Sequence, residues 1–259
     1  MPEKARAWGG LLYRGGAVIA IFAAWEAAQA IPLADPSLFP RPSRILVESV
    51  AMAASGALFH HALQSLARIL AGWALAAALG IPIGLAMGSW RVAEETVGTV
   101  VHFLRPISPV TWIPLAILLF GFGVGGPMFI VFLAAFFPIV LASAAAVRSV
   151  ETVQINAVRT LGADEVAVFR EVVIPGSMPG ILLGLRIALG NAWAAVVAAE
   201  LFGAQGGLGY LITQSVVFFE LSHVMVGMVL IGFTGFVLDW LFLRFVDRHL
   251  RWMPKREAT

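Results

Sequence analysis

Six long apolar stretches constrain this chain more than any other feature of its sequence. They lie at residues 15–33, 62–88, 97–120, 127–147, 180–201 and 222–244. Each is close to the roughly 20 residues that a helix needs to cross the ~30 Å hydrocarbon core of a bilayer. Hydrophobic residues make up 60% of the chain and charged residues 12%, which is more apolar surface than a soluble core of this size can bury. The sequence therefore predicts an all-α membrane protein with about six transmembrane helices, in a single domain over residues 1–259 with its core at 62–244.

The distribution of Lys and Arg sets the expected orientation, because these residues resist translocation across the membrane. If the N-terminus is cytoplasmic, most basic residues fall on the inner side, and the outer side keeps only Arg41, Arg44 and Arg68. The predicted outer loops 121–126 and 202–221 contain neither Lys nor Arg. We therefore expect the N- and C-termini in the cytoplasm. The segment 34–60 is then periplasmic, and its apolar spacing suits a short interfacial helix.

Residues 148–180 form a predicted cytoplasmic loop that is much longer than the other cytoplasmic connection, at 89–96. One apolar helical stripe recurs at steps of three and four: Val150, Val153, Ala157 and Leu161. Gly162 follows where the end of a helix needs a positive φ. Asp164 begins a second short helix, and Pro175 is expected to end it. The loop therefore predicts a hairpin of two helices joined at a glycine.

Within this loop, one short pattern is ordered as Asn156, Ala157, Val158, then Gly162, then Ile174 and Pro175. It resembles the cytoplasmic Glu-Ala-Ala, Gly, hydrophobic-Pro signature of the binding-protein-dependent permeases of ATP-binding cassette (ABC) importers. The surrounding RTLGADEVAVFREVVIPGSMPGILLGLRIALGNAW is similar to the nitrate, sulfonate and taurine branch of that family. Further matches to the branch are SLARILAGWALAAALGIPIGLAMG, LRPISPVTWIPLAILLFG, AAFFPIVL and VVAAELFGAQGGLGYLI. Together they cover most of the chain from Ser65 to Tyr210.

The resemblance implies the MetI-like fold of a type I ABC importer permease, with residues 148–180 as a coupling loop that docks on an ATPase. The residues it assigns to this contact are Asn156, Ala157, Val158, Leu161, Gly162, Ala163, Ile174 and Pro175. Asn156 stands where the family usually has Glu. A carboxylate there could pair with a basic group, whereas an amide can only form hydrogen bonds.

The resemblance also implies the partners. They are two ABC ATPase subunits, a second copy of the permease and a periplasmic or lipid-anchored substrate-binding protein, assembled in the inner (plasma) membrane of a bacterial cell among its lipids. ATP and Mg²⁺ are expected on the ATPase, because the chain has no G-x-x-x-x-G-K-[ST] motif and its only lysines are Lys4 and Lys255. We expect the chain itself to bind no cofactor, metal or nucleic acid and not to be an enzyme.

Polar residues in the third and fifth predicted spans are candidates for a substrate path, because ionisable groups are costly inside a bilayer. They are His102, Arg105, Ser108, Thr111, Asn191 and Trp193. The four in the third span recur at steps of three, which places them roughly along one helical face. For a small oxyanion, Arg105 would supply attraction and the two hydroxyls would donate hydrogen bonds. In the alternative interpretation Arg105 extends toward an interface and the hydroxyls bond to carbonyls freed by prolines.

Two acidic residues inside predicted spans are expected to be structural. Glu200 lies near the outer end of its span and is expected to contact a neighbouring helix or the membrane interface rather than to carry protons. The glycine-rich segment 205–210 is expected to form a tight outside turn, and the alternative is a segment that gates the path or meets the binding protein. Asp239 lies near the inner end of the last span, where it could pair with Arg244 or Arg248, and packing at the helix end is the default interpretation.

The sequence thus predicts the permease of an ATP-driven ABC importer. It would move a small oxyanion, such as taurine, an aliphatic sulfonate or nitrate, from a periplasmic binding protein into the cytoplasm by alternating access. An importer of another small solute is one alternative, and an ATP-independent channel or carrier is another from a different class. The hairpin disfavours the channel, which has no use for it. A membrane hydrolase is disfavoured because no nucleophile, base and orienting group lie at workable spacing.

Overall fold

The computed structural model describes residues 16, 20–27 and 40–249, which are almost entirely helical and include no strand. Among them, four helices are long and apolar enough to cross a membrane: Ala57–Ser89, Gly125–Arg148, Glu165–Gly203 and Leu221–Arg248. A fifth candidate span is a bent pair of helices, Arg91–Leu104 and Pro109–Phe120. These five match five of the six predicted stretches, and of the first stretch, 15–33, the structure describes residues 16 and 20–27, which are helical. The expected all-α membrane fold is confirmed.

The longer helices in chain order are α2 (Pro42–Ala54), α3 (Ala57–Ser89), α5 (Thr99–Leu104), α6 (Ile113–Phe120), α7 (Gly125–Arg148), α8 (Thr152–Thr160), α10 (Ile174–Gly203), α11 (Leu208–Val217) and α12 (Leu221–His249). Short turns join them: α4 (Arg91–Ala93), the π turn η1 (Glu94–Gly98), the 3₁₀ turn η2 (Pro109–Trp112), α9 (Glu165–Val168) and the π turn η3 (Phe169–Val173).

The third predicted span, 97–120, is not one continuous helix. Its two halves meet at an angle of 83°. Ser108, at the bend, has an extended backbone (ψ 135°), because the ring of the following Pro109 disfavours the helical conformation of the residue before it. The bend removes the single helical face on which four path residues were expected to lie.

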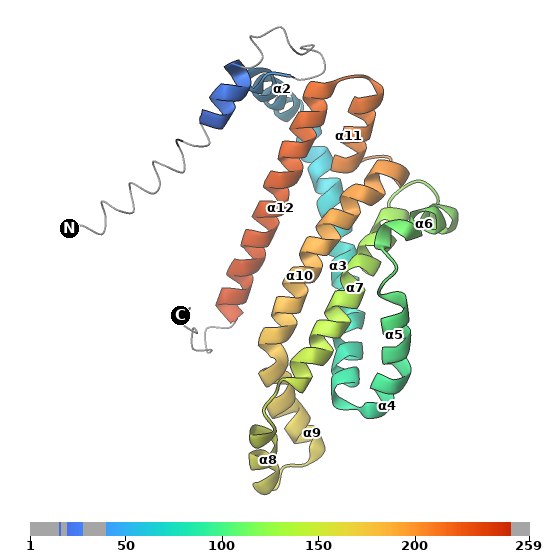
Figure 1. Cartoon of the computed structure of the whole chain (residues 1–259), viewed down its shortest axis with the longest axis vertical. Coiled ribbons are helices and arrows are strands. Elements are labelled where there is room, and N and C mark those ends of the chain that lie inside the picture. Colours follow the sequence, from blue (N-terminus) through green and yellow to red (C-terminus); the bar gives the residue numbers. More distant parts are fainter. Residues whose placement is uncertain (1–15, 17–19, 28–39, 250–259) are drawn as a thin grey trace, which may run out of the picture. The chain divides into compact units, whose positions relative to one another are not determined.

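Helices α3, α7 and α10 run side by side (Figure 1) and approach closely through small residues. A Cβ built on Gly84 of α3 would lie 2.5 Å from the Cβ of Ser143 in α7, and one on Gly184 of α10 would lie 2.3 Å from that of Ala142. Small residues let membrane helices pack at short distance, where van der Waals contact replaces the hydrophobic effect. The buried core between these helices includes Ile69, Ala76, Val131, Ile139, Ala188 and Val196.

The described residues divide into two compact units, one of residues 61–210 and 231–249 and one of residues 16, 20–27, 40–60 and 211–230. In the second, His223 contacts Glu220 at 2.7 Å and Glu48 of α2 at 3.3 Å. The helix expected within 34–60 is present as α2. The sequence predicted an outer loop at residues 202–221, but Leu208–Val217 within it form the helix α11. The residues of α11 are mostly apolar, which favours a helix over an open loop.

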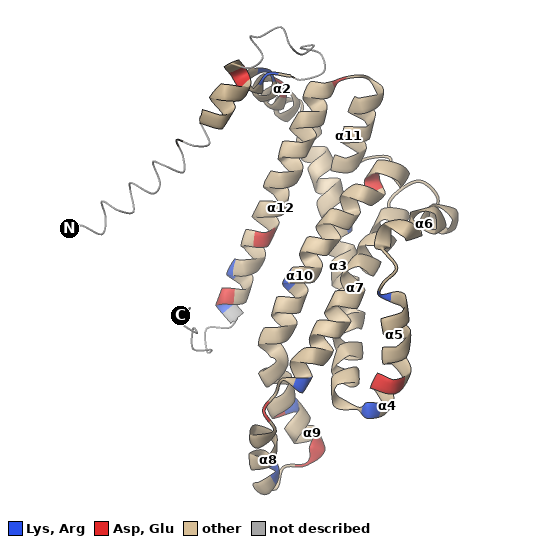
Figure 2. Ribbon diagram, viewed as in Figure 1, with Lys and Arg blue, Asp and Glu red and all other residues tan. Residues whose placement is uncertain are grey.

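Charged side chains concentrate at helix ends and around α8 and α9, and long stretches of the spans carry none (Figure 2). An exception is the pair formed by Arg186 of α10 and Asp239 of α12, with two hydrogen bonds of 2.8 and 2.9 Å. The candidate pairing of Asp239 with Arg244 or Arg248 is therefore wrong. Arg244 instead lies over the ring of Trp240, 3.8 Å from its centroid.

Candidate functional site

The predicted helix, glycine, helix hairpin is present at residues 152–173 (α8, the Gly162 turn, α9 and η3; hereafter the hairpin) and protrudes beyond the ends of α7 and α10 (Figure 1). Gly162 has a φ of +91°, and the amide of Ala163 bonds back to the carbonyl of Val158 at 3.3 Å. This is the left-handed cap by which glycine ends a helix. The Asp164 carboxylate accepts a hydrogen bond of 2.8 Å from the amide of Ala167 and so caps α9.

One face of the hairpin packs onto the rest of its compact unit. Val168 and Val173 are buried against Val147, the penultimate residue of α7, with half-buried Ile155, Val158, Ala163 and Phe169 around them. The ring of Trp90, just after α3, stacks on Phe169 with 6.3 Å between centroids. The hairpin therefore contacts α7 and the α3 end through an apolar core.

The other face of the hairpin is apolar but exposed. The side chains of Val153, Leu161 and Val166 are 75%, 87% and 72% exposed, and Asn156 and Ala157 on the same helix are also exposed. Three of these, Val153, Ala157 and Leu161, belong to the stripe that the sequence indicated, and its fourth member, Val150, is half-buried. The stripe thus faces outward, and different residues hold the hairpin to the protein.

Pro175 does not end the second helix as the sequence predicted. The chain from Glu165 to Gly203 is one helix of 39 residues, and Ile174 and Pro175 lie in its interior. Proline removes one backbone hydrogen bond and its ring presses on the preceding turn. The π turn η3, directly before Ile174, is wider than an α-helical turn and makes room for the ring of Pro175, so that the helix continues. The hairpin and a candidate membrane span consequently share one helix.

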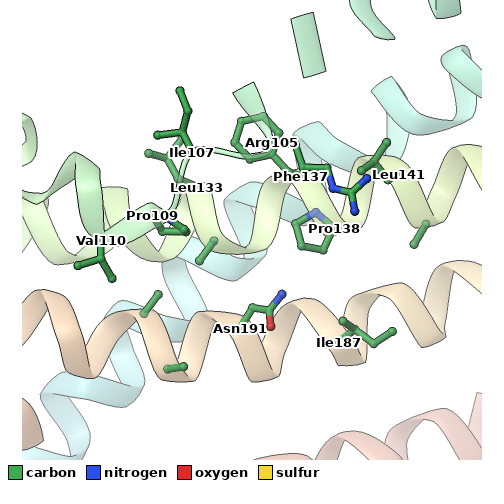
Figure 3. A pocket seen from close by; sticks show the side chains of 14 residues that line it. Arg105, Ile107, Pro109, Val110, Leu133, Phe137, Pro138, Leu141, Ile187 and Asn191 are labelled. Atoms are coloured by element: carbon green, nitrogen blue, oxygen red, sulfur yellow. The ribbon is translucent and has the colours of Figure 1, made fainter. Parts of the chain in front are cut away.

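A cavity of about 740 Å³ lies among the α5–η2 bend, α7 and α10. Among its described lining residues only Arg105 and Asn191 are polar. The rest are Ile107, Pro109, Val110, Leu133, Ala134, Phe137, Pro138, Leu141, Ala142, Ile187, Ala194 and Ala195. In Figure 3 the Asn191 side chain projects from α10 toward α7, and the guanidinium group of Arg105 lies beside Phe137, Pro138 and Leu141 of α7. One cation and one amide therefore face an otherwise apolar space.

The other four candidate path residues do not line this cavity. His102 lies 3.9 Å from Glu94 on the side of η1. Ser108 and Thr111 sit at the bend and in η2. Trp193 points toward α12, where a Cβ on Gly235 would lie 2.8 Å from its indole nitrogen.

With this architecture in place, the chain can be compared with known proteins. Residues 80–253, about two thirds of the chain, match the family of the binding-protein-dependent transport system inner membrane component. The chain belongs to this family. It is thus a multi-pass permease of the inner membrane, a translocation subunit rather than an enzyme.

Several named permeases are similar in sequence to most of this chain. A probable ABC transporter permease of Brucella abortus (strain 2308) is 41% identical over 85% of this chain and 87% of its own. The taurine transport system permease protein TauC of Escherichia coli (strain K12) is 32% identical over 91% and 87%. The bicarbonate transport system permease protein CmpB of Synechococcus elongatus is 32% identical over 76% and 69%. These relatives agree with the branch that the sequence resembles.

A solved structure shares the fold of the permease. An inward-facing conformation of the MetNI methionine ABC transporter superposes with a TM-score of 0.63 at 22% identity, over 74% of this chain and 94% of that one. The expected MetI-like fold is confirmed.

Sequence reasoning missed one group of charges beside the hairpin. Arg148, the last residue of α7, donates hydrogen bonds to Glu94 of η1 and to the carbonyl of Met87 in α3, the latter at 3.3 Å. Glu94 is 54 residues away, so no local spacing could have indicated this pair. The contact joins α3, η1 and α7 near the hairpin of the permease.

Proposed function

We propose that this permease is the translocation subunit of an ATP-driven importer and that the hairpin is its contact with a separate ATPase. The observation that carries the proposal is the outward face of the hairpin, with Val153, Leu161 and Val166 exposed. Apolar side chains on a protruding element favour burial in a partner's groove. Because the hairpin continues into α10 as one helix, its displacement would move a membrane span.

The complex would contain two ATPase subunits that bind ATP and Mg²⁺, two copies of the permease and a substrate-binding protein on the opposite side of the membrane. The exposed amide of Asn156 can contribute only hydrogen bonds to the ATPase contact. Shape and apolar burial around Ala157 and Leu161 would then hold the two proteins together.

Leu161→Asp tests the docking role. Leu161 contacts little of its own protomer, so the variant should fold. Burying one leucine contributes about 1.5–3 kcal/mol, which predicts roughly 10- to 150-fold weaker binding of the ATPase. Co-purification and titration of the ATPase against the permease in detergent would measure this. The matched control is Glu171→Ser, an exposed polar position in η3, and Asn156→Ala should weaken binding far less than Leu161→Asp. Unchanged ATPase binding by Leu161→Asp would contradict the proposal.

The substrate is proposed to be a small oxyanion. TauC and CmpB are named for taurine and bicarbonate, both of which carry negatively charged oxygens. In this permease Arg105 supplies a positive charge to the apolar cavity, where attraction is stronger than in water, and Asn191 supplies an amide that can donate a hydrogen bond. A cavity of about 740 Å³ is large enough for such a solute.

Arg105→Gln tests this path in proteoliposomes that contain the permease, its ATPase and the binding protein, with taurine, ethanesulfonate and bicarbonate as separate probes. Loss of a charge-assisted contact of about 1.5–3 kcal/mol predicts a fall in uptake of roughly 10- to 150-fold, with ATPase binding unchanged. Arg105→Lys should retain part of the uptake. Arg91→Gln, outside the cavity, is the control. Undiminished uptake by Arg105→Gln would exclude the anion path.

A further inference from the structure

Three polar side chains are buried together where α3 and the far end of α10 meet. Ser65 and Arg68 of α3 and Glu200 of α10 are 1%, 5% and 1% exposed. The Arg68 guanidinium donates a 2.6 Å hydrogen bond to Glu200, and the Ser65 hydroxyl lies 2.8 and 2.9 Å from the two carboxylate oxygens. These three residues, hereafter the clamp, join two helices through a buried charge pair.

The clamp also holds the backbone that follows α10. Arg68 donates to the carbonyl of Gly206 at 2.6 Å, Ser65 accepts from the amide of Leu208 at 2.9 Å, and Glu200 accepts from the amide of Gly209 at 3.0 Å. Polar backbone groups of a buried turn must find partners, and here the clamp supplies them. The segment 204–209 is thereby fixed to both helices.

Two glycines allow this close approach. Gly207 has a φ of +110°, and a Cβ there would lie 2.3 Å from a carboxylate oxygen of Glu200. A Cβ on Gly209 would lie 2.5 Å from the carbonyl oxygen of Val197. Any side chain at Gly207 would displace the carboxylate of Glu200, although Glu200 itself would be unchanged.

The clamp and the hairpin lie toward opposite ends of the 39-residue helix Glu165–Gly203 (Figure 1). At 1.5 Å per residue, Glu200 is about 50 Å from Glu165 along the axis. The cavity lies between them, because its last lining residue on α10, Ala195, is about 7.5 Å short of Glu200. A displacement of the hairpin that is transmitted along this helix would therefore move the residues that line the cavity and then those of the clamp.

We infer that Ser65, Arg68 and Glu200 are positioning residues for transport: they make α3, the far end of α10 and residues 204–209 one rigid body. Breaking a buried ion pair leaves an unpaired buried charge, which is strongly unfavourable. The hydrogen bonds and the ion pair of the clamp should therefore stay formed through the transport cycle. A displacement of the hairpin should then move the clamp end of α10 by the same amount, because this end does not separate from α3. The compensating movement would occur at the α5–η2 bend, where the helix is already interrupted. This inference rests on the proposed ATP-driven function.

Spin labels test the rigid body directly, because the chain has no natural cysteine. One pair of labels replaces the exposed residues Leu63 of α3 and Phe202 of α10, and a second pair replaces Phe103 and Leu118 on either side of the bend. Double electron–electron resonance on the complex with its ATPase compares the nucleotide-free and ATP–vanadate states. We expect an unchanged distance for the first pair and a changed distance for the second. A first pair that shifts as much as the second would overturn the inference.

A coupling measurement separates positioning from simple stability. In Glu200→Gln and in Gly207→Ala, ATPase binding and ATP hydrolysis should persist, whereas ATP consumed per molecule transported should rise roughly tenfold or more. The probe is whichever of taurine, ethanesulfonate and bicarbonate the wild-type complex transports best. Ile139→Ala, in the α7 core away from the clamp, is the control for lowered stability. If Glu200→Gln does not fold, the ratio of ATP consumed to molecules transported is measured in Gly207→Ala and Ser65→Ala instead.

The outcomes are distinguishable. Clamp variants with the same ATP-to-transport ratio as Ile139→Ala, at a similar thermal midpoint, would show a purely structural role and overturn this inference alone. A wild-type permease that binds no ATPase would overturn the proposed function, and this inference with it.

Discussion

Gly162 and Phe219 both hold a left-handed backbone just after a helix, although only the first is a glycine. Gly162 (φ +91°) follows α8 and Phe219 (φ +57°) follows α11. In both, the next amide bonds back to a carbonyl of the last turn, that of Val158 at 3.3 Å and that of Ser215 at 2.8 Å. Gly162 could be predicted because glycine adopts this conformation freely. A phenylalanine gives no such signal, since bulky residues rarely have positive φ.

Phe219→Gly should stabilise the permease by up to about 1 kcal/mol. Left-handed backbone costs an L-residue about 1–2 kcal/mol, and the greater chain entropy of glycine offsets part of the relief. Thermal unfolding in one detergent would measure the change. The matched control is the exposed neighbour Phe218, which lacks a positive φ, so that Phe218→Gly should lower stability. Equal shifts in the two variants would contradict the strain argument.

At the scale of the element, the sequence predicted where the spans lie but not where they break. Pro138 lies inside the unbroken α7, whereas Pro109 begins a new helix at the bend. A membrane helix tolerates proline where neighbouring groups satisfy the freed carbonyls, and local sequence does not show which groups those are. The grouping of His102, Arg105 and Thr111 on one face assumed an unbroken helix. With the bend present, of these three only Arg105 lines the cavity.

Close packing of α7 and α10 predicts opposite effects for two glycines of α10. Gly184→Ala should lower stability by about 1–3 kcal/mol, because the new Cβ would lie 2.3 Å from that of Ala142. At Gly190 no atom of a neighbouring described element lies within 4 Å of the Cβ position, so Gly190→Ala should be neutral or stabilising through higher helix propensity. Unfolding of both variants in the same lipid nanodisc would measure the difference. A comparable loss in Gly190→Ala would show that helix packing does not explain the effect.

At the scale of the whole molecule, two ion pairs between long helices join residues far apart in sequence. Arg186 and Asp239 are 53 residues apart, and Arg68 and Glu200 are 132 apart. Sequence reasoning looked for the partner of Asp239 on its own helix, where spacing can be counted. Membrane helices are apolar on most sides, so periodicity does not reveal which helix is the neighbour. The pairing of helices, and with it the clamp, therefore required the tertiary structure.

The surroundings of an ion pair decide how much it contributes. The Arg91–Glu95 pair beside η1 is exposed on a short connection, and such pairs in water contribute about 0.3–0.5 kcal/mol. Arg186 and Asp239 lie within candidate membrane spans, where an unpaired charge is costly because lipid cannot solvate it. Asp239→Asn in nanodiscs should therefore lower the thermal midpoint several times more than Glu95→Gln. The double variant Arg186→Met with Asp239→Leu should recover most of the loss, because it leaves no charge behind. Equal effects of the two single variants would place the Arg186–Asp239 pair in water, outside the hydrocarbon core.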